Sequence, residues 1–404
     1  MSTPIARTSQ EPPSSSARAA SNPLVVALLY NRNGMASWCW EAAHALHELG
    51  KDVILIATPD TPLPGTPEVE VIRLDIDGES VSPRARIRNP LFTALSHLNA
   101  EPDGLLERLH THLQARGVQP AAYILNQSTL VDQRVDCPQI MAAWSYPVDI
   151  LSYLRKIPVT VPDKSLKEFV RTALSLAGWW RKDWRAYRSA DRVLPVTGVL
   201  LKSLLERSVA SDLAYPGTCI SPVADRASTP VKLLMAAVKL GESRKRILWM
   251  LEAMKGMRPP AGTVLQLAGE PNDSVRQAAA MIGFPVEFLG HLRREELQQV
   301  MRKAHIFCFG SLLDDWGYVL VEAMANGLVP VAPAMSPFDE ILDGIGSCYN
   351  QQSQEDFVRI LGSVISGDLP SQGRQAWDRA QTLFSRQAFG RSILASLDKV
   401  APLH

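Results

Sequence analysis

The sequence lacks any apolar run long enough to span a bilayer, and its net charge of +1 favours neither nucleic acid nor an acidic partner. Its five cysteines are scattered, and an odd number without paired spacing indicates a reducing compartment rather than a disulfide framework. No CxxC or His-x-x-His pair suggests a zinc site. These absences leave an ordinary globular chain in which 46% of the residues are hydrophobic and 21% are charged.

The length of 404 residues is too great for one compact core, so two domains of comparable size are expected. Expected strands and helices alternate along the chain, which predicts parallel sheets of the α/β class. Residues 1–22 are rich in Ser, Pro and Ala, lack the apolar core of a secretory signal, and are predicted to be a disordered tail. We expect a first domain over 23–215, a linker over 216–230, a second domain over 231–385 and a final helix over 386–404.

The first domain opens with an expected strand–helix–strand unit. Pro23–Tyr30 and Asp52–Ala57 have the pattern of buried strands, Cys39–Leu49 that of an amphipathic helix, and Asn31–Trp38 that of a polar turn around Gly34. Such a unit implies a parallel sheet with ligands at the carboxyl ends of its strands. The turn does not match the GxGxxG fingerprint of dinucleotide-binding folds, and by itself Gly34 indicates only a chain reversal.

The stretch His305–Pro330 has the pattern strand, tight loop, helix, strand. Asp314 and Asp315 are of the residue type of helix N-caps, so a helix is predicted over Trp316–Ala325, where Glu322 is the only charge. Because an unpaired buried carboxylate is costly, Glu322 needs partners, either two hydroxyls such as a ribose supplies or a buried Lys or Arg. The helix start offers free backbone N–H groups to a phosphate or a polar sugar.

Several residues of this stretch together resemble the donor-site motif of the family-4 retaining glycosyltransferases of GT-B fold: Ser311, Asp314, Trp316, Gly317, Glu322, Ala323, Met324, Ala325 and Gly327. That motif has two glutamates separated by seven residues, and Asp314 stands in place of the first, with a reach shorter by one methylene. The resemblance spans most of Pro23–Val400 and is specific over Lys232–Ile341. It implies that Asp314 holds hydroxyls of the donor sugar and that Glu322 holds the ribose. The alternative is that Asp314 caps the helix and Glu322 pairs with a cation.

Four cations gather at the turn between the expected strand Lys232–Ala237 and the expected helix Ile247–Met257: Lys239, Arg244, Lys245 and Arg246. Basic groups beside a helix N-terminus suit a diphosphate. In the family an Arg is followed five or six residues later by a Lys. The resemblance puts Lys239 in the place of that Arg, and Lys245 or Arg244 in the place of that Lys. Lys cannot make the flat two-pronged contact that Arg makes.

The resemblance thus implies catalytic roles for Asp314, Lys239 and Lys245. It also implies a set of donor-binding residues: Glu322, Arg244, Gly34, Glu270, His291, Ser311, Trp316 and Gly317. Within this set, the Gly34 loop faces the donor phosphates, the segment of His291 lies against the base, and the helix start supplies backbone donors.

A long helix is expected over Lys164–Ala190. Its second half mixes aromatic residues with cations, among them Trp179, Trp180, Arg181, Trp184, Arg185 and Arg188. This composition is typical of a membrane-interface surface, but an acceptor pocket or ordinary packing has the same composition. Peripheral membrane contact through these six side chains is therefore one hypothesis among three.

The fold that the resemblance implies has two Rossmann-like domains with parallel sheets facing across a cleft, and a C-terminal helix that crosses back to the first domain. The implied activity is transfer of a hexose from a nucleotide-sugar to a hydroxyl of a glycan or lipid-linked acceptor, with retention of configuration, without a cofactor and without a bound metal. The implied setting is cell-surface polysaccharide or lipopolysaccharide synthesis, in the cytoplasm or at the inner face of the membrane, with no nucleic-acid partner.

Three alternatives stay open on the sequence. The first is another GT-B enzyme, such as a nucleotide-sugar epimerase or a disaccharide-phosphate synthase. The second is a non-catalytic nucleotide-sugar-binding partner of a true transferase, which donor hydrolysis or sugar transfer by the purified protein would dismiss. The third is a membrane-docked scaffold that acts through the aromatic and basic segment around Trp184.

Overall fold

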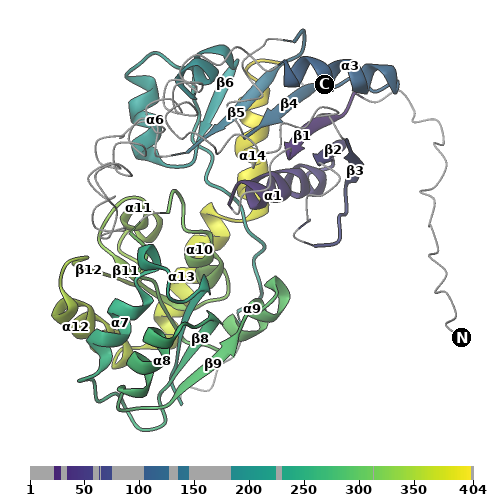
Figure 1. Cartoon of the computed structure of the whole chain (residues 1–404). Helices are drawn as coiled ribbons and strands as arrows, with labels where there is room; N and C mark the ends of the chain where they lie inside the picture. The colour runs from purple at the N-terminus through teal and green to yellow at the C-terminus, as the bar shows by residue number, and fades with distance from the viewer. Residues whose placement is uncertain are drawn as a thin grey trace, which may run out of the picture.

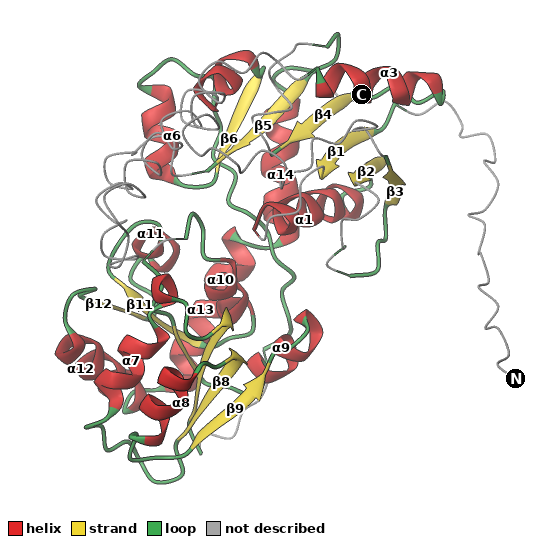
Figure 2. Ribbon diagram, viewed as in Figure 1, coloured by secondary structure: helices red, strands yellow, loops and turns green. Residues whose placement is uncertain are grey.

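The computed structural model describes residues 22–28, 34–57, 63, 65–74, 104–126, 135–144, 183–223, 230–312 and 314–401. These residues form two lobes, each built on one β-sheet with helices packed against it (Figure 1, Figure 2). None of the helices in these ranges has the length and apolar character needed to cross a membrane.

The first lobe contains a six-stranded sheet of order β3-β2-β1-β4-β5-β6, in which all neighbouring strands are parallel. Its strands are β1 (Leu24–Leu28), β2 (Val53–Ala57), β3 (Glu70–Arg73), β4 (Ala122–Leu125), β5 (Gln139–Ala143) and β6 (Arg192–Pro195), and its named helices are α1 (Gly34–Glu48), α3 (Leu105–Ala115) and α6 (Gly198–Leu205). Strand β2 is an apolar run buried along its whole length, as expected of a parallel strand that is covered on both faces. This strand order is that of a Rossmann fold.

The second lobe repeats the same topology. Its sheet has the order β12-β11-β10-β7-β8-β9, again with parallel neighbours, so β7 takes the place of β1 and β10 that of β4. The strands are β7 (Lys232–Lys239), β8 (Val264–Glu270), β9 (Val286–Gly290), β10 (Ile306–Cys308), β11 (Val329–Pro333) and β12 (Ser347–Tyr349). The helices are the 3-10 helix η3 (Ser243–Lys245), α7 (Ile247–Met254), α8 (Asp273–Ala280), α9 (Arg294–Met301), α10 (Tyr318–Ala325), α11 (Phe338–Leu342), α12 (Gln354–Ile365) and α13 (Leu369–Leu383).

The last helix, α14 (Arg386–Leu397), returns to the first lobe and packs along α1 (Figure 1). Close approach of the two helices depends on Gly390, since a Cβ there would lie 2.8 Å from Leu49 Cδ1 and 2.9 Å from the carbonyl oxygen of Ala45. Phe389 adds an edge-to-face contact with Trp38 at a centroid distance of 5.4 Å. The prediction of two Rossmann-like domains with a C-terminal helix that crosses back is confirmed.

Two predicted boundaries are wrong. Helix α1 begins at Gly34, so the expected turn up to Trp38 is helical where the structure describes it, because Trp38 and Ala42 continue a buried helical stripe that the polar reading of the segment overlooked. Helix α10 begins at Tyr318 rather than at Trp316, because Gly317 adopts a left-handed conformation with φ of 84° and ends the preceding loop.

The aromatic and basic segment is described only from residue 183 onward, where 183–189 are helical. Trp184 is buried there: it packs edge-on against Tyr187 at 5.8 Å, and the Arg207 guanidinium lies 5.2 Å from its ring centroid. Trp184 therefore belongs to the core of the first lobe, and the hypothesis that places it on a membrane-facing surface is wrong for this residue. Arg185 and Arg188 are exposed, and the other three residues of that hypothesis, Trp179, Trp180 and Arg181, lie outside the described residues.

Candidate functional site

The second sheet brings two distant segments together where its strand order reverses. Strands β7 and β10 are neighbours, with Leu233 beside Ile306 in the register. The strands that follow β7 in the chain lie toward one edge of the sheet, and those that follow β10 lie toward the other edge. Open α/β sheets bind ligands beyond the carboxyl ends of such strands. The two following segments are joined there by a hydrogen bond from the backbone N–H of Leu312 to the carbonyl oxygen of Arg244, at 3.1 Å.

Asp314 lies between two cations at this place. Its Oδ1 accepts a hydrogen bond from Arg244 Nη1 at 3.0 Å and its Oδ2 accepts one from Lys245 Nζ at 2.6 Å, while Glu242 accepts from Arg244 Nε. These four residues, Glu242, Arg244, Lys245 and Asp314, are called the basic cluster below. The expected N-cap role of Asp314 is wrong: Gly317 occupies the cap of α10, and two charge-assisted hydrogen bonds hold the carboxylate instead.

The other cations of the turn lie apart from the basic cluster. Arg246 points away, since its Nη1 donates to the carbonyl oxygen of Gln351 at 2.6 Å and its guanidinium lies 3.7 Å from the Trp249 ring centroid. Lys239 is exposed at the end of β7, forms no ion pair with the described residues, and is in register with Glu270, the exposed last residue of β8. His291 is exposed just beyond the end of the next strand, β9. The structure thus brings Lys239, Glu270 and His291 to the end of the sheet where the carboxyl ends of its strands lie.

Ser311 and Trp316 lie inside the protein rather than at its surface. The Ser311 side chain is fully buried, and its hydroxyl has no hydrogen-bond partner among the described residues. The Trp316 indole stacks on Tyr215 at 5.4 Å and contacts the edge of Phe384, so the indole itself is not available to a donor. With the helix start at Tyr318, the backbone donors of the first turn lie two residues later than expected. Gly34 is the first residue of α1, and residues 29–33 lie outside the described residues.

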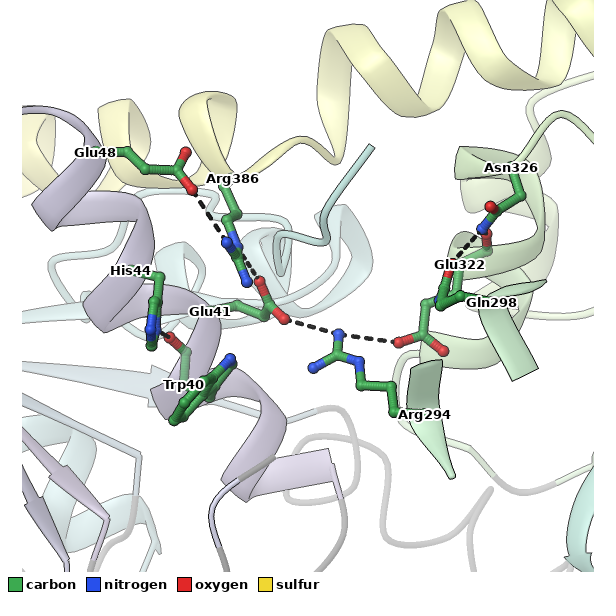
Figure 3. Close-up of polar contacts among 9 residues, drawn as sticks. All are labelled: Trp40, Glu41, His44, Glu48, Arg294, Gln298, Glu322, Asn326 and Arg386. Atoms are coloured by element: carbon green, nitrogen blue, oxygen red, sulfur yellow. Dashed lines mark hydrogen bonds and ion pairs between the residues drawn. The ribbon is translucent and has the colours of Figure 1, made fainter. Parts of the chain in front are cut away.

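Glu322 belongs to a chain of ion pairs that joins the two lobes (Figure 3). Its Oε1 accepts from Arg294 Nη2 at 3.1 Å, and the same nitrogen donates to Glu41 Oε1 on α1 at 2.8 Å. Glu41 Oε2 accepts from Arg386 Nε on α14, and Arg386 Nη1 donates to Glu48 at 3.1 Å. We call this set, Glu48, Arg386, Glu41, Arg294 and Glu322, the interdomain chain. Of the two interpretations of Glu322, pairing with a cation is what the described residues show.

Burial controls the electrostatics of the interdomain chain. The Glu41 side chain is 0% exposed, and two arginines satisfy its two oxygens. Burial also raises the pKa of the Glu322 carboxyl, because the charged form loses hydration; Arg294 opposes this shift and the Glu41 charge adds to it. For Arg386, burial acts to lower the pKa, but Glu41 outweighs it and the pKa is raised.

Sequence reasoning missed both Glu41 and Arg294. A signal for Glu41 was present, because this carboxylate follows Trp40 and precedes two alanines on a helix, the same anomaly that singled out Glu322. Arg294 carried no signal, since it stands in a run of two arginines and two glutamates that is typical of a solvated helix start.

A second contact between the lobes involves Glu340 of α11. Its Oε1 accepts from the backbone N–H of Gly198 at 2.6 Å and from the Tyr215 hydroxyl at 2.7 Å. Gly198 is the first residue of α6, so the carboxylate lies at the positive end of that helix. Because Tyr215 also stacks on Trp316, this contact connects the first lobe to the loop that precedes α10.

Among the described residues, no group of three or more His, Cys, Asp or Glu side chains is placed to hold a metal ion. The basic cluster at the β7–β10 end contains two cations and two carboxylates in contact with one another. Arg244 and Lys245 can exchange a carboxylate oxygen for a phosphate oxygen without a large change in geometry. Both kinds of oxygen accept hydrogen bonds from the same N–H donors.

Comparison with known proteins finds similarity to glycosyltransferases in the second domain. Residues 231–366 match the family model described as "Glycosyl transferases group 1". Over 81 residues the chain is 32% identical to the gpi3 subunit of phosphatidylinositol N-acetylglucosaminyltransferase of Schizosaccharomyces pombe, a match covering 20% of this chain and 18% of the relative. Over 166 residues it is 28% identical to the MMP alpha-(1->4)-mannosyltransferase of Mycolicibacterium hassiacum, covering 38% and 40%. The chain thus spans less than half the length of either curated relative.

Solved structures match over nearly the whole chain. Sucrose-phosphate synthase from Thermosynechococcus elongatus has a TM-score of 0.66 at 17% identity, covering 94% of this chain and 99% of that one. HepE of Anabaena, solved in complex with UDP and glucose, has a TM-score of 0.59 at 13% identity, covering 94% and 100%. At such identities the likeness concerns the fold, and the chain therefore has the two-domain GT-B fold, with a glycosyl transferases group 1 match in its second domain.

Proposed function

We propose that the protein is a glycosyltransferase that moves a sugar from a nucleotide-sugar to a hydroxyl of a glycan or lipid-linked acceptor. The observation that carries the proposal is the convergence of Arg244, Lys245 and Asp314 beyond the carboxyl ends of β7 and β10. Cations held at this position suit a diphosphate, and stabilising a leaving diphosphate is the main electrostatic task when a nucleotide-sugar is cleaved. The group 1 match over 231–366 covers the same segments.

In this proposal the diphosphate binds against Lys245 and Arg244, with Lys239 nearby at the end of β7. Diphosphate oxygens take over hydrogen bonds that Asp314 accepts in the structure, which frees Asp314 to bind hydroxyls of the donor sugar. The unoccupied oxygen of Glu322 accepts from the ribose. Retention of configuration, and reliance on these cations rather than on a bound metal, are further parts of the proposal that rest on the motif resemblance.

The donor and acceptor classes draw support from the relatives. One relative is a subunit of phosphatidylinositol N-acetylglucosaminyltransferase, and another is a mannosyltransferase. A structural neighbour was solved in complex with UDP and glucose. We therefore propose a nucleotide-sugar donor and a role in assembling cell-surface polysaccharide, lipopolysaccharide or glycolipid at the cytoplasmic side of a membrane.

A thermal-shift panel of UDP, GDP, ADP and dTDP sugars tests the proposal, with the parent protein, Glu322→Gln and the control Glu252→Gln, an exposed glutamate on α7 that undergoes the same isosteric change. A ligand at about 100 times its dissociation constant adds about 2.7 kcal/mol of stability. We expect one nucleotide class to stabilise the parent and the control, and to stabilise Glu322→Gln less. Stabilisation by none of the four classes would contradict the proposed donor site.

Binding alone does not separate an enzyme from a non-catalytic partner. Release of free sugar or free nucleoside diphosphate from the donor identified in the panel is therefore measured next. Slow donor hydrolysis by the parent, reduced in Lys245→Met, supports catalysis by the basic cluster. Binding without any hydrolysis, and without transfer to lipid or glycan acceptors, would favour the non-catalytic nucleotide-sugar-binding alternative.

A further inference from the structure

One nitrogen of Arg294 connects two carboxylates from different lobes. Nη2 donates to Glu41 Oε1 at 2.8 Å and to Glu322 Oε1 at 3.1 Å, as Figure 3 shows. The second oxygen of Glu41 is taken by Arg386. The second oxygen of Glu322 has no hydrogen-bond partner among the described residues, and the Glu322 side chain keeps 13% of its surface exposed. Both oxygens of Glu41 therefore have a partner, whereas one oxygen of Glu322 has none among the described residues.

A second polar atom at this place also lacks a partner. The Tyr318 hydroxyl is buried without a hydrogen bond to the described residues, and its charged surroundings are Glu41, Glu322 and Arg294. Buried polar atoms are almost always hydrogen-bonded. Tyr318 and Glu322 lie four positions apart on α10, so an unpaired hydroxyl and an unpaired carboxylate oxygen among the described residues are available at this place to a polar ligand.

We propose that Arg294 is a positioning residue of the donor site: held by Glu41 of the first domain, it orients Glu322 so that the second carboxylate oxygen meets the ribose hydroxyls of the nucleotide. This inference rests on the proposed function. It implies that the ribose subsite is complete only when α1 of the first domain lies against the start of α9. The first domain then contributes to nucleotide affinity through Glu41 without contacting the nucleotide at that point.

Charge supports the same role. The charged and titratable groups facing Glu322 are Arg294 from α9, Glu41 from α1 and Tyr318 from α10 itself, with Arg386 of α14 behind Glu41. Burial raises the pKa of Glu322, and Arg294 favours its charged form. Removing the Arg294 charge therefore raises the pKa of Glu322 further. The loss of nucleotide affinity on acidification then begins at a higher pH.

The test uses whichever of UDP, GDP, ADP and dTDP binds the parent protein. Calorimetry measures the affinity of this nucleoside diphosphate and of its counterpart that lacks the ribose hydroxyls. The variants are Arg294→Gln and Arg294→Lys, with Arg293→Gln as the matched control, since Arg293 is the preceding residue, is 76% exposed and pairs with Glu296. In the parent, loss of the hydroxyls is expected to weaken binding about tenfold, as for hydrogen bonds to a charged group.

In Arg294→Gln we expect this tenfold discrimination to shrink to about twofold or less, and the acidic limb of the affinity profile to move to higher pH. Arg294→Lys keeps the charge and is expected to keep the limb near its parental pH, while losing part of the discrimination because Lys cannot hold the same geometry. Arg293→Gln should behave like the parent. A purely structural role for Arg294 would lower affinity for both ligands equally and leave their ratio unchanged.

Glu41→Gln tests the part played by the first domain. It is expected to reduce the discrimination as Arg294→Gln does, and circular dichroism confirms which variants remain folded. If Glu322→Gln loses discrimination but folded Arg294→Gln and Arg294→Lys keep it at the parental value, the positioning role is wrong and the proposed donor site stands. If the parent binds none of the four nucleotides, the proposed function itself fails, and the inference fails with it.

Discussion

The basic cluster and the interdomain chain are both built from carboxylates between cations, yet they differ in burial and in reach. The basic cluster joins residues 69 and 70 positions apart within one lobe, and the side chains of Lys245, Asp314 and Arg244 are 17%, 18% and 33% exposed. The interdomain chain joins residues 253 positions apart around a carboxylate with no exposure. Partly hydrated ion pairs contribute little to stability and can exchange partners, whereas a buried carboxylate cannot lose its partners without a large cost. We infer that the first region is suited to binding a ligand and the second to holding the lobes in place.

The largest expected effect is on the buried side of this comparison. Glu41→Gln leaves Arg294 and Arg386 without their shared partner and should lower the free energy of unfolding by about 3–5 kcal/mol, as when one member of a buried pair is removed. Urea denaturation followed by circular dichroism measures this. Glu48→Gln removes a more exposed partner of the same Arg386 and should cost about 1 kcal/mol or less. Equal costs for the two variants would remove the distinction between the regions.

Next in size is the loss of a cation from the basic cluster. Lys245→Met should lower turnover of the identified donor about 100-fold, in the range seen when one stabilising donor is removed from a reacting site, and should change stability little. Lys239→Met is the comparison, and we expect a smaller loss of about tenfold because this lysine is exposed at the strand end. Steady-state rates and urea denaturation of both variants measure the two effects. Unchanged turnover in both would mean that the diphosphate binds elsewhere.

Substitution of the two carboxylates of the motif, Asp314 and Glu322, should affect different quantities, turnover for the first and nucleotide affinity for the second. Asp314→Asn frees Arg244 and Lys245 from a competing negative charge, so affinity for the nucleoside diphosphate should hold or rise while turnover falls about tenfold. Glu322→Gln should instead weaken affinity about tenfold. Calorimetry with the diphosphate and steady-state kinetics with the donor distinguish these outcomes. A similar loss of affinity in both variants would contradict the assignment of different roles.

The smallest effect on stability is expected at an exposed ion pair near the end of α14. Lys399 pairs with Asp212 at the end of α14, but it is half exposed, and Asp212 keeps its contacts with Arg192 and Ser396. Lys399→Met should therefore change the free energy of unfolding by about 0.5 kcal/mol. Thermal or urea denaturation measures this against Glu41→Gln. A loss above about 2 kcal/mol would show that α14 depends on this pair rather than on its packing against α1.

Much of the second domain was predictable because its signals are local. The pattern of the second domain placed Lys239 at the turn that follows an expected strand. The structure shows Lys239, Glu270 and His291 at the carboxyl ends of β7, β8 and β9, which parallel topology brings to one end of the sheet. The partner of Asp314 was not predicted, because the N-cap expectation used residue type alone, whereas Gly317 ends the loop and the neighbouring turn supplies two cations. The burial of Trp184 was open for a similar reason, since a mixed aromatic and basic composition does not say which face a helix turns to the core.

Sequence periodicity predicted the alternating strands and helices of two parallel sheets, because these depend on which residues alternate or repeat within a few turns of chain. The crossing of the last helix and the donor-site motif came from the family resemblance. The sequence also showed that Glu322 needed a partner, because a charge on an apolar helix is costly wherever the helix lies. Only the docking of the two lobes decided that this partner is Arg294 and that Glu41 holds it, because contacts between residues 253 positions apart depend on the relative placement of surfaces that no local pattern encodes.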